Sequence, residues 1–125
     1  MIYFARMLDK IRKHARGELR ADFQGNLGKG FDARCAGFLR VSYEPLKERV
    51  LQGGSDEEVL RWCFASGREL DAEDIVVWNE FLRKRGWNDE ASEILAKRKA
   101  ESGLAARADI QTMLDYFEVD EGRRA

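Results

Sequence analysis

Apolar residues recur at intervals of three and four along most of this chain, and that period is typical of amphipathic helices. The first such run predicts a helix over residues 2–16, with an apolar face made of Phe4, Leu8, Ile11 and Ala15. A glycine follows most of the runs, as expected just beyond a helix end. The pattern therefore predicts a series of short helices that stop at glycines.

Capping signals place the next helices. A short helix is predicted over residues 31–39, and Ser42 begins a third helix that ends at Gly53. Ser55 and Glu58 have the spacing of a capping box, in which the serine accepts from a backbone N–H and the glutamate reaches back. This pair predicts the start of a fourth helix.

Three further helices follow in the second half of the chain. Asp71 caps a fifth helix, and its helical period continues to Gly86, although residues 75–78 taken alone would also suit a strand. Asn88 opens a sixth helix, which ends at Gly103. The seventh carries the apolar positions Ile110, Met113, Leu114 and Phe117.

No fixed repeat and no linker interrupts this series, so the apolar faces must cover one another. The chain has 125 residues, of which 44% are hydrophobic and 36% are charged, a composition typical of globular domains. We therefore predict an all-α fold without a substantial sheet. It would be a single compact domain over residues 1–125, with about six to seven short helices.

Composition also narrows the partners. The chain has 22 Lys and Arg against 23 Asp and Glu, which disfavours nucleic-acid binding through a general positive field. The apolar run at the N-terminus is too short for a signal peptide or a membrane span, so we expect a cytoplasmic protein without membrane attachment. Oligomeric state stays open at this point.

The soft ligands of a metal site are scarce. His14 is the only histidine, and the two cysteines, Cys35 and Cys63, form no CxxC motif. We predict no metal and no cofactor. The cysteines are expected to be reduced and buried, because a chain of this length does not need a disulfide to be stable.

The segment from Asn26 to Arg34 is the strongest chemical candidate. Lys29 lies between glycines just before a predicted helix, where an ammonium group and free backbone N–H groups could bind a small anion. The glycine spacing is not that of a P-loop. In the structural alternative, which we favour, Gly28 permits a tight loop and Asp32 complements the helix dipole.

A mixed-charge cluster would form if the first helix packed beneath this loop. Such a cluster could bind a zwitterion or organise a partner; as an ion-pair network, the alternative we favour, it would only hold the loop in place. Lys10 lies beside Arg6 on the same helix, at a helical spacing. The residues of this predicted cluster are Arg6, Asp9, Lys29, Asp32 and Arg34.

Trp87 lies in the short connector between the predicted fifth and sixth helices. A tryptophan there can fill the core between the helices or stand out as an interface anchor. We favour the core position.

Several segments resemble a family of small bacterial proteins known as domain of unknown function five-zero-six-nine. They include the runs YFARMLDKIR, NLGKGFD and GGSDEEVL, and they cover residues 3–12, 26–32, 53–60, 62–64, 78–79, 81–82, 84–87, 89–92, 109–112 and 120–123. The resemblance implies a small bacterial cytoplasmic domain and supplies no activity or catalytic residue.

Three functions remain open. The favoured one is a binding or regulatory module that recognises a macromolecule, a protein above all, through its helical faces and the loop from Asn26 to Arg34. An enzyme, or a protein that binds an anionic or zwitterionic metabolite in the charged cluster, is less favoured, and no catalytic residue is predicted. The third is a ribosome or nucleic-acid helper with the basic face Lys10, Arg12, Lys13, Arg16 and Arg20. The predicted binding residues are Arg6, Asp9, Lys10, Asn26, Lys29, Asp32, Arg34 and Trp87.

Overall fold

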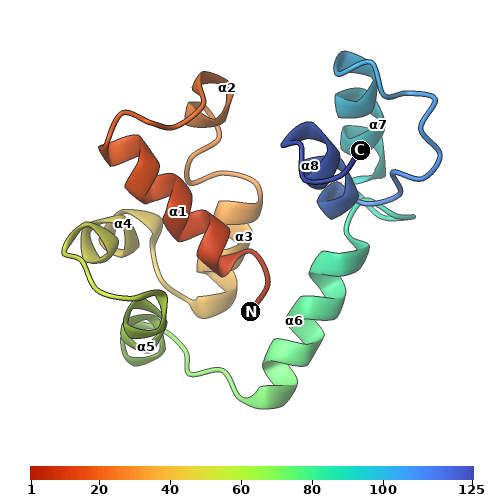
Figure 1. The fold of residues 1–125 in the computed structure, drawn as a ribbon. Helices are drawn as coiled ribbons and strands as arrows, with labels where there is room; N and C mark the ends of the chain where they lie inside the picture. The colour runs from red at the N-terminus through yellow and green to blue at the C-terminus, as the bar shows by residue number, and fades with distance from the viewer. The chain divides into compact units, whose positions relative to one another are not determined.

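A computed structural model describes residues 1–125, which form helices joined by loops, without any strand (Figure 1). The predicted all-α class is confirmed, and the helix count of eight is slightly higher than the six to seven expected. The helices are α1 (Phe4–Ala15), α2 (Ala21–Gln24), α3 (Phe31–Leu39), α4 (Tyr43–Leu51), α5 (Asp56–Ser66), α6 (Ala72–Lys84), α7 (Ser92–Glu101) and α8 (Met113–Asp120).

The contacts divide the chain into two compact units, Met1–Ile75 and Val76–Ala125. The boundary falls inside α6. Each unit has buried apolar residues of its own. That residues 1–125 fold as one domain stays a prediction.

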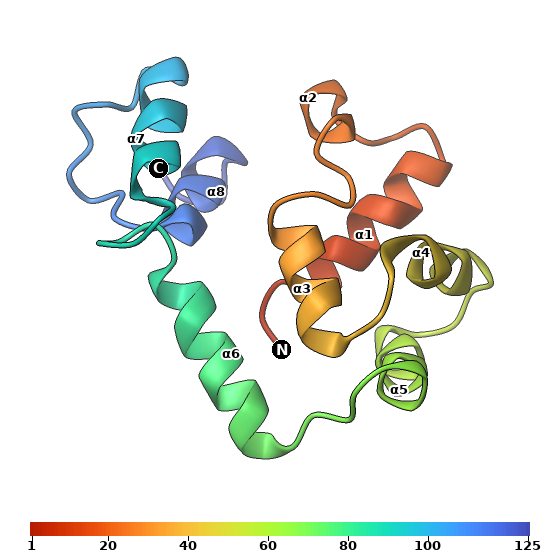
Figure 2. The ribbon, with the colours of Figure 1, turned by 180° about the vertical axis from the view of Figure 1, so that it is seen from behind.

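The first unit is organised around α4, which contacts α1, α3 and α5. Figure 2, seen from behind, shows α4 beside both α1 and α5. Helical spacing places the apolar residues of these four helices on facing sides. Its fully buried apolar side chains are Met7, Leu8, Cys35, Leu39, Leu46, Val50, Val59 and Cys63.

The second unit is held by contacts between α7 and α8. Leu95 of α7 and Met113 and Tyr116 of α8 are buried. The Tyr116 hydroxyl lies 2.7 Å from the Ser102 hydroxyl at the end of α7, and the Met113 N–H donates to the Arg85 carbonyl at 2.8 Å. The first contact joins α8 to the end of α7, and the second joins the start of α8 to the end of α6.

Three elements differ from the sequence prediction. Helix α8 begins at Met113, so Ile110, which was predicted within the last helix, lies before it. The stretch taken as irregular before residue 31 contains α2, a single turn too short to show a hydrophobic period. Helix α7 begins at Ser92 and not at Asn88. The Asp89 carboxylate accepts from the N–H groups of Gly86 and Ala91, and Asn88 has a left-handed φ of 49°, so this segment forms a closed loop before the helix begins.

Of the four predicted capping residues, Asp71 caps its helix, Ser55 does so in part, and Ser42 and Asn88 do not. The Ser55 hydroxyl accepts from the Glu58 N–H at 3.2 Å, but the Glu58 carboxylate accepts from the Ser55 hydroxyl and does not complete the predicted capping box. Asp71 and Asp74 each accept from the other's backbone N–H, at 2.8 and 3.0 Å. Ser42 occupies the N-cap position of α4, but its side chain makes no capping hydrogen bond.

The ends of α3 and α5 meet at Gly67. A Cβ atom on Gly67 would lie 2.2 Å from the Leu39 carbonyl oxygen, so only glycine fits. The following N–H, from Arg68, donates to that same oxygen at 2.9 Å. The residues after α5 therefore complete the C-terminal end of α3.

None of the eight helices combines the length and apolar character that spanning a bilayer requires. Cys35 and Cys63 are buried and form no disulfide, which confirms the prediction of buried free thiols.

Candidate functional site

A buried ion pair joins α1 to α3. Asp32 of α3 is fully buried, and its Oδ1 lies 2.8 Å from the Lys10 ammonium of α1. The Tyr3 hydroxyl donates to the same oxygen at 2.5 Å, and Lys10 also donates to that hydroxyl at 2.9 Å. The other oxygen, Oδ2, accepts from the Gly28 N–H at 3.0 Å. Every charge in this Asp32 network is thus compensated, as burial demands.

Tyr3 adopts an unusual backbone conformation to reach the network. Its φ of 74° is left-handed, which is strained for a bulky residue. The phenol hydrogen bond to Asp32 and an edge-to-face contact with Phe31, at 5.4 Å between ring centroids, hold it there. Burial, and next the Asp32 charge, raise the pKa of Tyr3 far above its ordinary value, so the phenol remains a donor.

The loop before α3 is fixed from both sides. Gly28 has a φ of 74°, and a Cβ there would lie 2.8 Å from the Tyr43 ring. Burial, and secondarily Asp32, raise the pKa of Tyr43 to about 12. Within the loop, the Lys29 N–H donates to the Asn26 carbonyl at 3.0 Å. Asp32, Tyr43 and the turn at Asn26 thus all contact the loop.

The contacts of the predicted cluster residues differ from the prediction. Asp32 pairs with Lys10, which was not a member of the cluster, whereas exposed Asp9 pairs with Lys13 on its own helix at 3.2 Å. The Arg6 guanidinium lies over the Phe23 ring at 5.5 Å. The side chains of Asn26, Lys29 and Arg34 are exposed. The geometry matches an ion-pair network that holds the loop, with Lys10 as the cation, and the binding role of the predicted residues stays a prediction.

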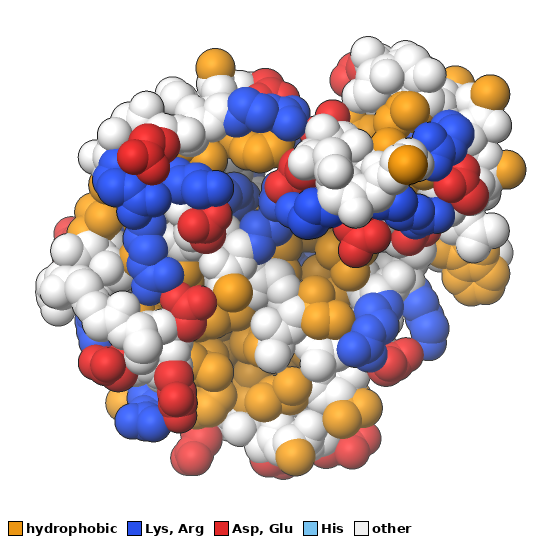
Figure 3. Space-filling view, in the orientation of Figure 1, with side chains coloured by type: hydrophobic (Ala, Val, Ile, Leu, Met, Phe, Trp, Pro, Cys, Tyr) orange, Lys and Arg blue, Asp and Glu red, His pale blue; other side chains and the backbone are white.

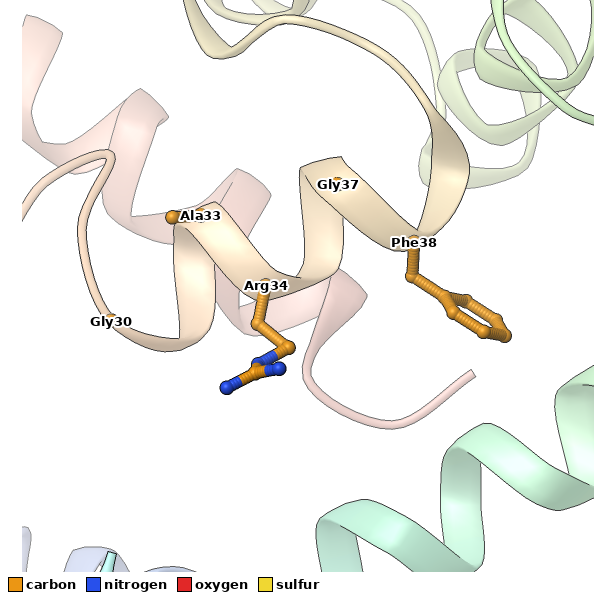
Figure 4. A pocket seen from close by; sticks show the side chains of 5 residues that line it. All are labelled: Gly30, Ala33, Arg34, Gly37 and Phe38. Carbon is orange, nitrogen blue, oxygen red and sulfur yellow. The ribbon is translucent and has the colours of Figure 1, made fainter. Parts of the chain in front are cut away.

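The outer face of α3 carries an open pocket of about 540 Å³. Small residues at helical spacing leave the backbone uncovered, and the Arg34 and Phe38 side chains project outward beside them (Figure 4). We call this pocket the α3 groove; it is lined by Gly30, Ala33, Arg34, Gly37 and Phe38.

Arg68 flanks the groove. Its guanidinium stacks over the Phe38 ring at 4.5 Å from the centroid, a cation–π geometry. Its Nε and Nη2 atoms are buried and make no hydrogen bond. The Phe38 ring is therefore held in place by a cation that carries unused donors.

The basic face predicted for nucleic acid is neutralised residue by residue. Figure 3 shows blue and red side chains interspersed over the face in view. Each of the five cations has an acidic partner within 3.2 Å: Lys10 with Asp32, Arg12 with Asp56, Lys13 with Asp9, Arg16 with Glu18, and Arg20 with Asp22.

With the geometry established, comparison with known proteins places the chain in a family. The model of a family described as "Domain of unknown function (DUF5069)" matches residues 1–123. The chain belongs to the DUF5069 family. No curated protein and no solved structure matches it. The family assignment confirms the resemblance seen in the sequence motifs, and the function must be argued from the structure.

The two thiols of this DUF5069 domain are held in their protonated form. Burial, and next the Asp32 charge, raise the pKa of the Cys35 thiol to about 12. Burial likewise raises the pKa of Cys63 to about 11. Thiols react as thiolates, so neither cysteine is a nucleophile at neutral pH. No group of three His, Cys, Asp or Glu residues is arranged to hold a metal ion.

The core position preferred for Trp87 is wrong, because 56% of its surface is exposed. Gly86, with a φ of 100°, occupies the space beside Leu95 and Met113, where a Cβ would meet both side chains at 3.2–3.3 Å. The Gly86 backbone therefore occupies the space beside Leu95 and Met113. The Asp89 carboxylate accepts from the Gly86 N–H, which holds the chain in a turn at this point.

Sequence reasoning about this DUF5069 chain missed Tyr3, Gly37, Phe38 and Arg68. Tyr3 lies in a family motif, but no local pattern predicts a left-handed tyrosine. The four-residue spacing of Ala33 and Gly37 was a usable signal for an uncovered helix face. Arg68 follows a helix end with no signal that it reaches Phe38.

Proposed function

We propose that this DUF5069 domain is a protein-recognition module, and that the α3 groove binds an apolar, acid-bearing segment of its partner. The observation that carries the proposal is the groove itself, an open pocket of about 540 Å³ on a rigidly supported helix. Cys35, the thiol on the same helix, is fully buried and its pKa is raised to about 12, so it offers no nucleophile to the groove.

The openness of the groove favours a macromolecule over a metabolite. Pockets for small ligands bury most of the ligand surface, whereas the α3 groove is open along the helix. Asp32, the acidic member of the predicted metabolite cluster, is fully buried and does not reach the surface. A partner segment that brings its own covering surface suits this geometry better.

The Asp32 network supports recognition by holding the groove rigid. It ties α1, the Gly28 loop and the buried face of α3 together through four polar contacts. A surface that is already ordered loses little conformational entropy when a partner binds. The α3 groove lies on the face of α3 opposite to Asp32, so this network orders the helix that carries the groove before a partner binds.

The chemistry of the groove selects an acidic, apolar partner. Gly30, Ala33 and Gly37 allow a close approach of another backbone, and Phe38 offers an apolar contact. Arg34 lines the groove and Arg68 flanks it, so a carboxylate meets complementary charge. Buried free cysteines suit the reducing cytoplasm, where we place the partner.

The nucleic-acid alternative is weaker. Its basic face is paired with carboxylates at every position, and the chain has a net charge of −1. Binding that depends on releasing counterions from phosphates needs cations that are available to those phosphates.

Filling the groove tests the proposal. A Cβ on Gly37 meets no atom within 4 Å, so Gly37→Leu should fold while its side chain occupies the groove. Gly37→Ala is the matched control, because it makes the same backbone change with little added volume. Tagged wild type and both variants are used to capture partners from lysate, and chemical cross-links locate the contact.

We expect wild type and Gly37→Ala to retain a common partner, cross-linked near α3 through an acidic segment, and Gly37→Leu to lose it. A partner retained by Gly37→Leu, or cross-links confined to other helices, would show that the groove is not the binding site. Capture of no specific partner by wild type would contradict the function itself.

A further inference from the structure

The Arg68 guanidinium beside the α3 groove uses its flat face and leaves one edge unused. The face lies over the Phe38 ring, with the central carbon 4.5 Å from the ring centroid. Hydrogen bonds from a guanidinium lie in its plane, so this stacking leaves the edges available for them. The Nε and Nη2 atoms are both buried and make no hydrogen bond. These two atoms form one edge of the guanidinium, because their N–H bonds are parallel.

Elsewhere in the chain the same edge of an arginine binds a carboxylate. The Nε atom of Arg107 donates to Oδ1 of Asp109 at 2.8 Å, and its Nη2 atom donates to Oδ2 at 2.8 Å. The Nε and Nη2 atoms of Arg20 bind the two oxygens of Asp22 in the same way. Two parallel hydrogen bonds to one carboxylate are a strong and planar arrangement that arginine favours. Arg68 presents this edge without an acceptor.

We propose that the unused edge of Arg68 is an anion subsite of the α3 groove, and that it binds the side-chain carboxylate of an aspartate or glutamate in the partner. This assignment rests on the recognition role proposed for the groove and adds the residue that binds the partner's acid. Buried donors without acceptors cost free energy, which a carboxylate recovers by accepting from both. The Arg68 side chain as a whole is only partly buried, so a small rotation about its own bonds turns the edge toward the groove.

Charge and shape favour a side-chain carboxylate over other anions. A carboxylate brings one negative charge to the single guanidinium charge, whereas a phosphate group brings nearly two and leaves an excess at a buried edge. The α3 groove is open, so a partner chain can continue past Phe38 and need not end there. Apolar neighbours of the acidic residue then lie against the Phe38 ring.

Acetate, the simplest organic carboxylate, tests the subsite without any partner. In proton–nitrogen correlation NMR spectra, the Nε–H signal of Arg68 is assigned by its loss in Arg68→Lys. This signal should shift downfield as sodium acetate replaces sodium chloride at constant ionic strength. The Nε–H signal of Arg107 is the internal control, because Asp109 already occupies its edge. No shift at Arg68, or an equal shift at Arg107, would overturn the proposal.

Display of short random segments inside a loop of a carrier protein, where no chain terminus is free, tests the partner chemistry. We expect wild type to enrich segments in which one aspartate or glutamate lies among apolar residues, and Gly37→Leu to lose them. A peptide of the enriched sequence, blocked at both ends, should bind Arg68→Lys about tenfold more weakly than wild type, because lysine keeps the charge but has no planar edge. Arg107→Lys is the matched control and should bind as tightly as wild type.

A cycle of paired changes assigns the contact. Replacing the acid of the peptide with its amide should weaken binding to wild type by a similar factor, and should weaken binding to Arg68→Lys no further. Independent losses, or enriched segments without an acid, would overturn the Arg68 subsite while the groove remains a recognition site. Enrichment of no segment, or of segments that Gly37→Leu retains, would contradict the proposed function, and the acetate response decides separately on the Arg68 edge.

Discussion

At the residue scale, Asp32 is the most consequential position. It is fully buried and is the only carboxylate in the network with Lys10 and Tyr3. A buried ion pair adds little net stability, but removing one partner leaves the other charge without compensation. Its position makes Asp32 a positioning residue for α1, α3 and the loop between them.

We therefore predict that Asp32→Ala lowers the free energy of unfolding by about 3–5 kcal/mol, since it leaves the Lys10 ammonium buried and unpaired. The double variant Lys10→Met, Asp32→Ala removes that charge and should be less destabilised than Asp32→Ala alone. Urea unfolding measures both. A double variant that loses as much as the sum of the single variants would show that the two residues are not coupled.

Two glycines should respond to alanine in opposite directions. Gly37 lies inside α3 with open space around a Cβ, so Gly37→Ala should raise the free energy of unfolding by about 0.5–1 kcal/mol. Gly67→Ala should lower it, because its Cβ would press against the backbone oxygens of Leu39 and Arg40. Thermal unfolding of both variants makes the comparison, and a matching sign would contradict it.

Some residues of the Asp32 network could be predicted from the sequence, but their contacts could not. Asp32 was named as a candidate because it follows a glycine-rich loop, and Lys10 because it lies beside Arg6 on the charged face of the first helix. Their pairing depends on the packing of α1 against α3, and no local pattern encodes it. Tyr3 was missed for the same reason. Its left-handed backbone is stabilised by the hydrogen bond to Asp32, which lies 29 residues further along the chain.

At the scale of the element, the limits of a helix were predicted correctly where its capping residues and its apolar pattern indicate the same start and end. The limits of α3 match the predicted residues 31–39, because Gly30 and the change in apolar pattern mark them. The start of α7 was wrong because Asn88 and Asp89 are compatible with either a cap or a loop, and side-chain hydrogen bonds to Gly86 decide for the loop. Helix α2 was too short to carry a period.

The caps of α8 and α4 give a matched test. Thr112 accepts from the Asp115 N–H at 3.1 Å in a full capping box, whereas Ser42 makes no capping bond. Thr112→Ala should therefore lower the free energy of unfolding by about 1 kcal/mol, and Ser42→Ala should change it by much less. Chemical denaturation compares the two. Equal losses would mean that the Thr112 hydrogen bond contributes nothing in solution.

At the scale of the whole molecule, buried weak acids set the response to high pH. The pKa values of Cys35 and Cys63, ordinarily 9.0, are raised to about 12 and 11, and that of Tyr43, ordinarily 10.0, to about 12. Each group keeps its proton longer in the folded chain than in the unfolded chain. The unfolded state thus binds fewer protons above pH 9.

It follows that the free energy of unfolding is unaffected by these groups below about pH 9 and falls as the pH rises from 9 toward 12. Each group contributes at most about 1.4 kcal/mol per pH unit. Urea unfolding at pH 8, 10 and 11 under reducing conditions measures the decline. A curve that stays flat over this range would mean that the thiols and the phenol are accessible to water in the folded state.

The candidate site could not be assembled from sequence at this scale. Phe38 precedes α4 in the chain and Arg68 follows α5, yet the Arg68 guanidinium lies 4.5 Å from the centroid of the Phe38 ring. Tertiary packing brings the end of α5 to the end of α3 and so places Arg68 against Phe38 of the groove. Fold class, in contrast, followed from the apolar period alone.

The contact between the ends of α3 and α5 determines how short a fragment of the chain could be and still present the α3 groove. The lining residues end at Phe38, but the terminal carbonyl of α3 is satisfied by the N–H of Arg68, whose side chain also covers Phe38. A peptide cut after α3, or even after α5 at Ser66, would carry the complete lining and lack its support. The shortest autonomous piece that presents this surface must extend past residue 68, so the groove is a product of five helices although one helix displays it.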